Sequence, residues 1–171
     1  MLILGTNCIS HDTSAAIVKD GKLLFAIEEE RLSGKKHTSE FPIKSIQACL
    51  NFARATIQDV DAIAVSFDVE EHIKQRFLGY WKNSYPAGKE RMLAELDVVK
   101  RLANLEQEIR DKLNFKNKIY FCKHHVAHMA SAYYLSGFND SALMSIDGAG
   151  EIESLVVGRA SPDYFVTMPH H

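Results

Sequence analysis

The sequence has 171 residues, 46% of them hydrophobic and 25% charged, and a formal net charge of −2. This length and composition exclude a fibrous or disordered protein and predict a soluble globular fold with a buried core. The near-neutral charge argues against a surface that grips nucleic acid or anionic lipid, so neither is expected as a partner. No stretch approaches the ~18 apolar residues of a membrane span, and the three cysteines form no CxxC pair. We therefore predict reduced thiols and a cytoplasmic location.

The first 28 residues predict three strands of an antiparallel meander. Residues 2–7 are a short apolar run typical of a buried strand, and residues 14–19 and 22–28 are two further candidates. Asp20 and Gly21 separate the second and third strands, and Asp-Gly is a strong signal for a tight hairpin turn.

A helix, a strand and a charged block are predicted next. Pro42 opens a segment whose apolar residues recur at helical spacing, and the apolar residues 62–67 predict a strand. Residues 68–113 are rich in Glu, Lys, Arg and Leu and are interrupted at residues 85–88, which predicts two helices, the second from about Lys89 to Leu113. We interpret this block as an insertion or lid with solvated charged faces; a binding role is the alternative.

The end of the chain resembles its start. Residues 118–122 predict a strand, the histidine-rich segment after them a helix, and residues 141–146 a strand that ends at Asp147. Residues 154–159 and 164–168 then predict a hairpin, so strand, turn and hairpin occur twice. This repetition predicts a duplicated α/β unit, with a first half at residues 1–140 and a second half that opens at 141–171. We expect the native chain to continue beyond His171, because the hairpin would otherwise expose an unpaired edge.

Two histidines and a carboxylate predict a metal site. His124 and His128 are four residues apart, so they lie on one face of a helix. Their Cβ atoms are then about 6 Å apart, which lets both rings ligate one cation. Asp147, at the end of a predicted strand, supplies a third ligand. Two imidazoles and a carboxylate suit iron(II), zinc or manganese better than calcium or magnesium. The alternative is a helix whose histidines cap or pack, and His125 between them is expected behind the ligands or facing substrate.

Three segments resemble the carbamoyltransferase family that includes the nodulation-factor and antibiotic O-carbamoyltransferases and is related to the tRNA threonylcarbamoyl transferases. They are GTNCISHDTSAAIVKDGKLLFAIEEERLSGKKH at residues 5–37, HHVAHMASAYYLSGF at 124–138 and SIDGAGE at 145–151. The resemblance implies a duplicated α/β fold of the actin-like/Hsp70 ATPase (ribonuclease H-like) type. In this interpretation the first half is complete and the second half has only begun.

The resemblance also implies a biosynthetic, ATP-using activity in two steps. Carbamoyl phosphate and ATP give carbamoyl-adenylate at a YrdC-like domain of the full-length chain, and the carbamoyl group then passes, with metal assistance, to a hydroxyl of a small-molecule acceptor. By this resemblance the metal is iron(II), with zinc and manganese as alternatives. We expect the present chain to be a catalytic-domain fragment that is inactive by itself.

Site residues follow from the resemblance position by position. His124, His128 and Asp147 match iron-type ligands, with a further aspartate ligand expected beyond residue 171. His11 and Asp12 match a catalytic element, and Gly148, Ala149 and Gly150 match a loop that binds the nucleotide phosphate. The residues that match the acceptor pocket are Glu30, Arg31, Lys36 and His37. Gly34-Lys35 departs from the family, which more often has a basic pair there.

His11 is the candidate general base. An imidazole ordinarily titrates near neutral pH, which suits removal of a proton from an acceptor hydroxyl. The alternative is a turn histidine whose ring only caps Asp12 or the following backbone.

Two other functions remain open. One is an ATP-dependent kinase or ATPase of the actin-like superfamily, which would use magnesium and is disfavoured by the paired histidines. The other is a non-catalytic metal-binding or interaction module, with residues 68–113 as the contact surface of a homo-oligomer.

Overall fold

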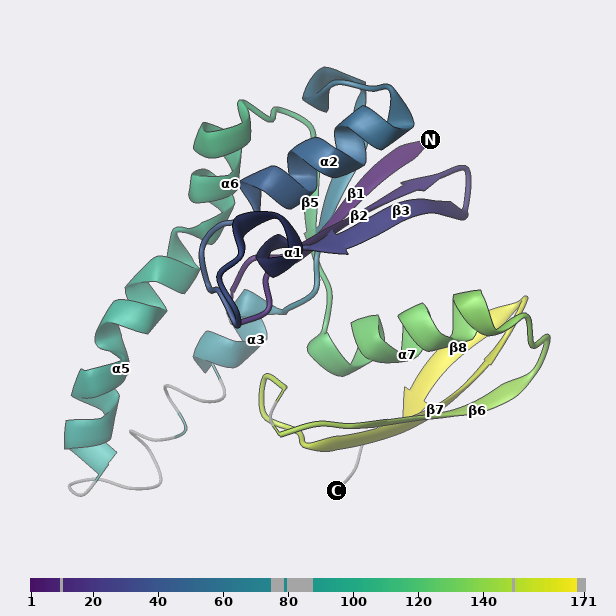
Figure 1. Ribbon diagram of the computed structural model, residues 1–171. Helices are drawn as coiled ribbons and strands as arrows, with labels where there is room; N and C mark the ends of the chain where they lie inside the picture. Colours follow the sequence, from purple (N-terminus) through teal and green to yellow (C-terminus); the bar gives the residue numbers. More distant parts are fainter. Residues whose placement is uncertain (10, 75–78, 80–87, 149, 169–171) are drawn as a thin grey trace. The chain divides into compact units, whose positions relative to one another are not determined.

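The computed structural model describes residues 1–9, 11–74, 79, 88–148 and 150–168 (Figure 1). The chain divides into two compact units, the first from residues 1–66 and 96–121 and the second from residues 67–95 and 122–171. The helix that carries His124 and His128 therefore belongs with the strands that follow it. The predicted division of a duplicated fold at residues 140 and 141 stays a prediction.

The first unit is built on a five-stranded mixed sheet in the order β3-β2-β1-β4-β5. β1 pairs antiparallel with β2, and β2 with β3, which confirms the predicted meander. β1 and β4, and β4 and β5, pair in parallel. The strands are β1 (Leu2–Asn7), β2 (Ser14–Lys19), β3 (Lys22–Glu28), β4 (Ala62–Val65) and β5 (Lys118–Phe121). The turn between β2 and β3 is the predicted Asp20-Gly21 pair, with φ of 49° and 78°, as this kind of hairpin turn requires.

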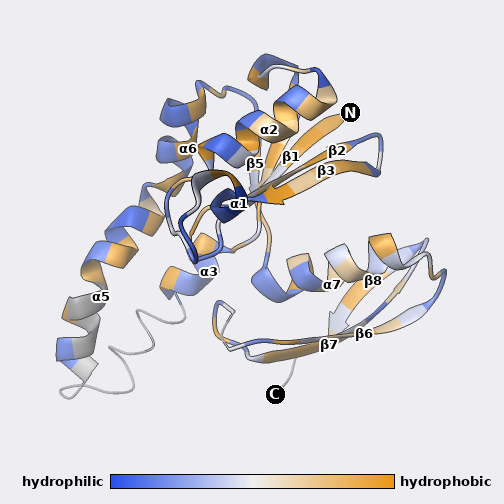
Figure 2. Cartoon of the chain, viewed as in Figure 1, coloured by the Kyte–Doolittle hydropathy of each residue, from blue (hydrophilic) through white to orange (hydrophobic). Residues whose placement is uncertain are grey.

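The core of this unit lies between the sheet and α2 (Ile43–Ala53), which packs on β2 and β3. Alternate strand residues point to the same face, and Leu4, Ile17 and Ile63 are fully buried, together with Ile46 and Cys49 of the helix. Figure 2 shows the apolar residues of β1, β2 and β3 and the mixed surface of α2. The helix predicted after Pro42 is confirmed. A short 3-10 helix, η1 (Ile57–Asp59), leads from it to β4.

The helices depart from the prediction in two places. A short helix that was not predicted, α1 (Glu29–Ser33), follows β3; it closes at Gly34, whose φ is 75° and whose N–H donates to the Glu30 carbonyl. The single helix predicted from Lys89 to Leu113 is two helices, α5 (Gly88–Ala103) and α6 (Leu105–Leu113). They are separated at Asn104, whose backbone leaves the helical conformation with φ −100° and ψ 5°.

The second unit contains a three-stranded antiparallel sheet in the order β6-β7-β8. The strands are β6 (Ser141–Ile146), β7 (Leu155–Ser161) and β8 (Tyr164–Met168), as predicted to within two residues. α7 (His124–Ser136) packs on β6 and β7 through a core of Met129, Tyr133, Leu143 and Ala160. The sequential antiparallel pairing repeats that of β1, β2 and β3.

The charged block contributes one more short helix to the second unit. α3 (Val69–His72) begins after Asp68, whose carboxylate accepts a hydrogen bond from the Glu71 backbone N–H (3.0 Å). The rest of the first helix predicted for this block, and its break at residues 85–88, lie largely outside the described residues. Among the helices that are described, none has the length and apolarity needed to cross a membrane.

The three cysteines are free, and they should differ in reactivity. Cys8 and Cys49 are fully buried, and burial raises the pKa of Cys8 to about 12 and that of Cys49 to about 11. Burial also raises the pKa of Cys122, which is only partly buried. Because the thiolate is the reactive form, we expect iodoacetamide at pH 8 to alkylate Cys122 first, as read by peptide mass spectrometry. A urea-unfolded sample should lose the difference, and equal native rates would contradict the expectation.

Candidate functional site

Three predicted metal ligands come together in the second unit. His124 is the first residue of α7 and His128 follows one turn later, while Asp147 comes directly after β6. Nε2 of His124 lies 2.8 Å from Oδ2 of Asp147, and Nε2 of His128 lies 3.3 Å from the same oxygen. The two Nε2 atoms are 3.0 Å apart. Two ring nitrogens and one carboxylate oxygen therefore converge on a single point.

This convergence fits a divalent cation. A neutral imidazole presents one lone pair, and two such nitrogens beside a carboxylate oxygen form a donor set for iron(II), zinc or manganese. The pKa of Asp147 is lowered to about 2, first by the bond from His124 and then by the Gly148 N–H. The carboxyl group is therefore ionised at neutral pH, as a metal ligand must be. The sequence predicted this grouping; the metal itself stays a prediction.

A buried carboxylate, which the sequence reasoning missed, holds the first ligand in place. Glu151 is only 2% exposed. Its Oε1 accepts from the backbone N–H groups of His124 (2.9 Å) and Asp68 (2.7 Å). It thus caps the start of α7, where backbone N–H groups lack helical partners. Its position in the SIDGAGE segment was the only sequence signal, and that segment suggested a phosphate-binding loop instead.

His125 lies behind the ligands and is buried. Its Nδ1 is 2.7 Å from the Ser145 hydroxyl of β6, and its Nε2 is 2.8 Å from the Glu153 carbonyl. Gly150 packs against this ring so closely that an added Cβ would lie 2.8 Å from Cδ2 of His125. The ring therefore joins α7 to the strand and loop that carry Asp147.

The predicted phosphate loop is only partly described, because Ala149 lies outside the described residues. The Gly148 N–H donates to Oδ1 of Asp147 (2.6 Å), and the Gly150 N–H donates to the Glu153 carbonyl (2.8 Å). Both amides are thus engaged within the loop. Their role in binding a nucleotide phosphate stays a prediction.

A groove of about 570 Å³ lies beside β6 within the second unit. His128 and Asp147 contribute to its lining, and most of its other lining residues are apolar. Its volume is in the range of small-molecule sites, so there is space for a ligand next to two of the three converging side chains.

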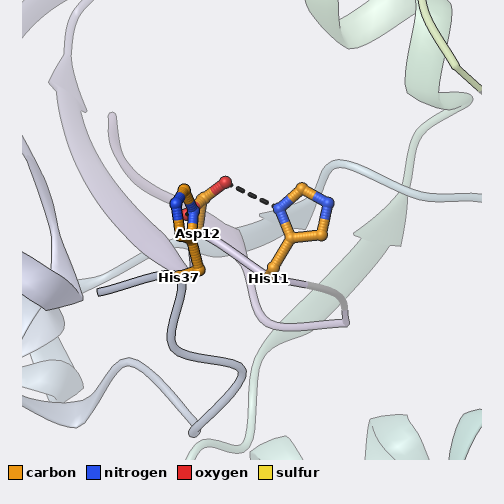
Figure 3. A group of neighbouring side chains, drawn as sticks. All are labelled: His11, Asp12 and His37. Carbon is orange, nitrogen blue, oxygen red and sulfur yellow. Dashed lines mark hydrogen bonds and ion pairs between the residues drawn. The ribbon is translucent and has the colours of Figure 1, made fainter. Parts of the chain in front are cut away.

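The first unit contains a second cluster, formed by His11, Asp12 and His37 (Figure 3). Nδ1 of His11 lies 2.6 Å from Oδ2 of Asp12, and Nδ1 of His37 lies 3.0 Å from Oδ1. These bonds, that of His11 first, lower the pKa of Asp12. The structure thus joins two residues predicted to be catalytic with one predicted on the acceptor side.

The other acceptor-side residues surround this cluster loosely. Glu30 accepts from the His37 backbone N–H (3.0 Å), Arg31 pairs with Glu28 (3.3 Å), and Lys36 is exposed. Glu29, in the middle of the same EEER element, has a different role. It is buried, and its Oε2 accepts from the backbone N–H and the hydroxyl of Ser45, both at 2.8 Å, so that it caps α2.

Comparison with known proteins gives a consistent result. The family model described as carbamoyltransferase N-terminus matches residues 2–165. Nodulation protein NolNO of Sinorhizobium fredii is 34% identical over 155 residues, which are 89% of this chain and 22% of that protein. An uncharacterized protein of Synechocystis, sll1178, is 32% identical over 186 residues, 98% of this chain and 29% of that protein. The chain thus spans about a quarter of the length of these relatives.

Among solved structures, YeaZ from Pseudomonas aeruginosa is similar with a TM-score of 0.50 and 14% sequence identity, covering 99% of this chain and 65% of that one. At this identity the likeness concerns the fold alone. It agrees with the mixed five-stranded sheet and supports the predicted α/β fold of the actin-like type.

Proposed function

The chain belongs to the carbamoyltransferase family, whose N-terminal part it matches over residues 2–165, and we propose from this that it supplies the transfer site of an O-carbamoyltransferase. In this proposal a carbamoyl group passes from carbamoyl-adenylate to a hydroxyl of a small molecule. The observation that carries the proposal is the convergence of His124, His128 and Asp147 on one point in a chain of this family. The adenylate would be made from carbamoyl phosphate and ATP by a YrdC-like domain elsewhere in the full-length protein.

His124, His128 and Asp147 would hold the metal. When bound, a divalent cation supplies positive charge that can offset charge on phosphate oxygens and on the carbonyl oxygen. The protein keeps Asp147 ionised through its bonds from His124 and from the Gly148 N–H. It also holds the start of α7 through Glu151, so that the ring of His124 keeps its place beside Asp147.

His11 would act as the general base. The acceptor oxygen forms a bond to the carbonyl carbon, its proton moves to the His11 ring, and the bond between that carbon and the phosphate oxygen of AMP breaks. A positioned base of this kind contributes roughly 10²- to 10⁴-fold to a rate. The position of His11 beside the ionised Asp12 supports this assignment.

The test uses the full-length protein with ATP, carbamoyl phosphate and a panel of small-molecule alcohols. We expect release of AMP and pyrophosphate that depends on carbamoyl phosphate, and a carbamoylated alcohol detected by mass spectrometry. A magnesium-dependent kinase would instead release ADP and phosphorylate the alcohol, and a non-catalytic module would release nothing. Either of these results would overturn the proposal.

A further inference from the structure

The two histidine–aspartate clusters differ in geometry. In the second unit both rings approach the same oxygen, Oδ2 of Asp147, and the ring centroids are 4.4 Å apart. In the first unit each ring has its own oxygen of Asp12, His11 on Oδ2 and His37 on Oδ1, and the centroids are 6.4 Å apart. The first arrangement shares one point, as metal ligands do. In the second, the carboxylate bridges two rings.

We propose that Asp12 and His37 are positioning residues that hold His11 in the tautomer with its hydrogen on Nδ1, so that Nε2 carries the lone pair and acts as the base. The inference rests on the proposed function, because it assumes that His11 is the general base of the carbamoyl transfer. It adds a role for His37, which the sequence placed only near the acceptor pocket, and it makes Asp12 a residue that acts through His11.

The tautomer follows from hydrogen-bond chemistry. An ionised carboxylate has no hydrogen to donate, so the 2.6 Å contact with Oδ2 of Asp12 requires the hydrogen to be on Nδ1 of His11. The lone pair of the neutral ring then lies on Nε2. Figure 3 shows the ring with this second nitrogen turned away from Asp12. The lowered pKa of Asp12 agrees with an ionised acceptor at neutral pH.

His37 performs the corresponding task for Asp12. Its Nδ1 lies 3.0 Å from Oδ1, so the second oxygen of the carboxylate is fixed as well as the first. A carboxylate held on both oxygens cannot rotate away from His11 without breaking one bond. His37 therefore limits the rotation of Asp12, and Asp12 in turn sets the ring of His11.

The backbone of both loops is anchored for this arrangement. The Asn7 side-chain amide donates to the Asp12 carbonyl (3.2 Å). The Thr13 N–H donates to the Thr38 carbonyl (3.3 Å), which joins the two loops next to the cluster. Asp12 and His37 both have positive φ, 58° and 51°, a backbone conformation that is uncommon for residues other than glycine.

The proton balance of the step is simple. The acceptor hydroxyl gives its proton to Nε2 of His11 as its oxygen bonds to the carbonyl carbon and AMP departs. The resulting imidazolium still donates its Nδ1 hydrogen to the Asp12 carboxylate. The negative charge of Asp12 stabilises the positive ring, and Asp12 is not itself protonated. The ring returns the proton to solvent after the product leaves.

The first measurement is a nitrogen NMR spectrum of the full-length protein with ¹⁵N-labelled histidine rings, in which His11 is assigned by its loss in His11→Asn. We expect the Nδ1-protonated pattern for His11, and a shift toward the other tautomer in Asp12→Asn. An Nε2-protonated His11 in the unmodified protein would overturn the inference. This measurement needs no turnover, so it tests the geometry even if the proposed reaction is wrong.

Kinetics provide the second measurement. Asp12→Asn should lower kcat on the order of 10²-fold or more with a small change in KM. His37→Ala should lower kcat by less, and His37→Asn, whose amide can donate to Oδ1, should restore most of it. Asp20→Asn is the matched control, because it also replaces an aspartate of positive φ by asparagine. Aspartate and asparagine are both favoured before glycine in this type of hairpin turn. An unchanged kcat in Asp12→Asn would overturn the positioning role.

Metal analysis provides the third. Two metal ions per chain, one of which disappears in both Asp12→Asn and His37→Ala, would show a second metal site here and overturn the inference. If only His128→Ala loses metal, the result supports Asp12 as a bridge between His11 and His37. The metal then belongs to the cluster of His124, His128 and Asp147.

Discussion

Replacing His128 by alanine is expected to remove the bound metal without unfolding the protein. The Nε2 atom of His128 lies 3.0 Å from that of His124 and 3.3 Å from Oδ2 of Asp147, so its loss leaves one imidazole and one carboxylate. Mutation of a group that only supports a metal ligand lowers the affinity for the metal by about 10- to 100-fold. Loss of the ligand His128 itself should lower this affinity by at least about 100-fold. Carbamoyl transfer should fall with the metal.

The His128 side chain is about half exposed, so the folded state should change little, within about 0.5 kcal/mol. The measurement is metal content after purification, followed by titration of the apoprotein with iron(II), zinc and manganese. His37→Ala is the matched control, since it removes an exposed histidine of the other cluster. Metal content that does not differ between His128→Ala and the unmodified protein would show that the convergence is only a hydrogen-bonded cluster.

Replacing Glu151 by alanine should cause the largest loss of stability among the substitutions considered. The buried carboxylate accepts from the backbone N–H groups of His124 and Asp68, and both N–H groups would lose their partner. Hydrogen bonds to a charged group are worth about 1.5–3 kcal/mol each, so we expect a loss of about 3 kcal/mol or more. Glu151→Gln keeps an acceptor oxygen and should lose about half as much.

The measurement is urea-induced unfolding, with metal affinity as a second readout because α7 begins at His124. Glu70→Ala is the control. It removes an exposed glutamate of the same unit that pairs with Lys74, and such surface pairs contribute about 0–1 kcal/mol. Equal unfolding midpoints for the Glu151 and Glu70 variants would contradict the capping role.

The strands were predictable because their signals are local. Residues 2–7, 14–19 and 22–28 carry their own hydrophobic pattern, and the Asp20-Gly21 turn specifies how the last two of these strands connect. The errors also have local causes. α1 has five residues, too few to show a helical period, and the break between α5 and α6 is confined to the single residue Asn104.

The pairing of His124 and His128 was predictable for a related reason. The spacing of His124 and His128 places both rings on one side of any helix. Asp147 is 23 residues from His124 and was indicated by its place at the end of a predicted strand and by the family resemblance. The bridge between Asp12 and His37 was not predictable in this way. The sequence assigned them to two different elements, a catalytic loop and the acceptor pocket, and only the fold of the loops before β2 and after α1 brings their side chains together.

The sequence by itself determined where the strands lie along the chain, the α/β class, the family resemblance and the pairing of His124 with His128, since each depends on residues close together in the chain. Only the tertiary structure decided which of several similar acidic residues are buried. Glu29 and Glu30 are neighbours with the same side chain, yet Glu29 caps α2 and Glu30 binds the His37 backbone. Burial of a carboxylate depends on backbone N–H groups brought from elsewhere, which no local pattern reports.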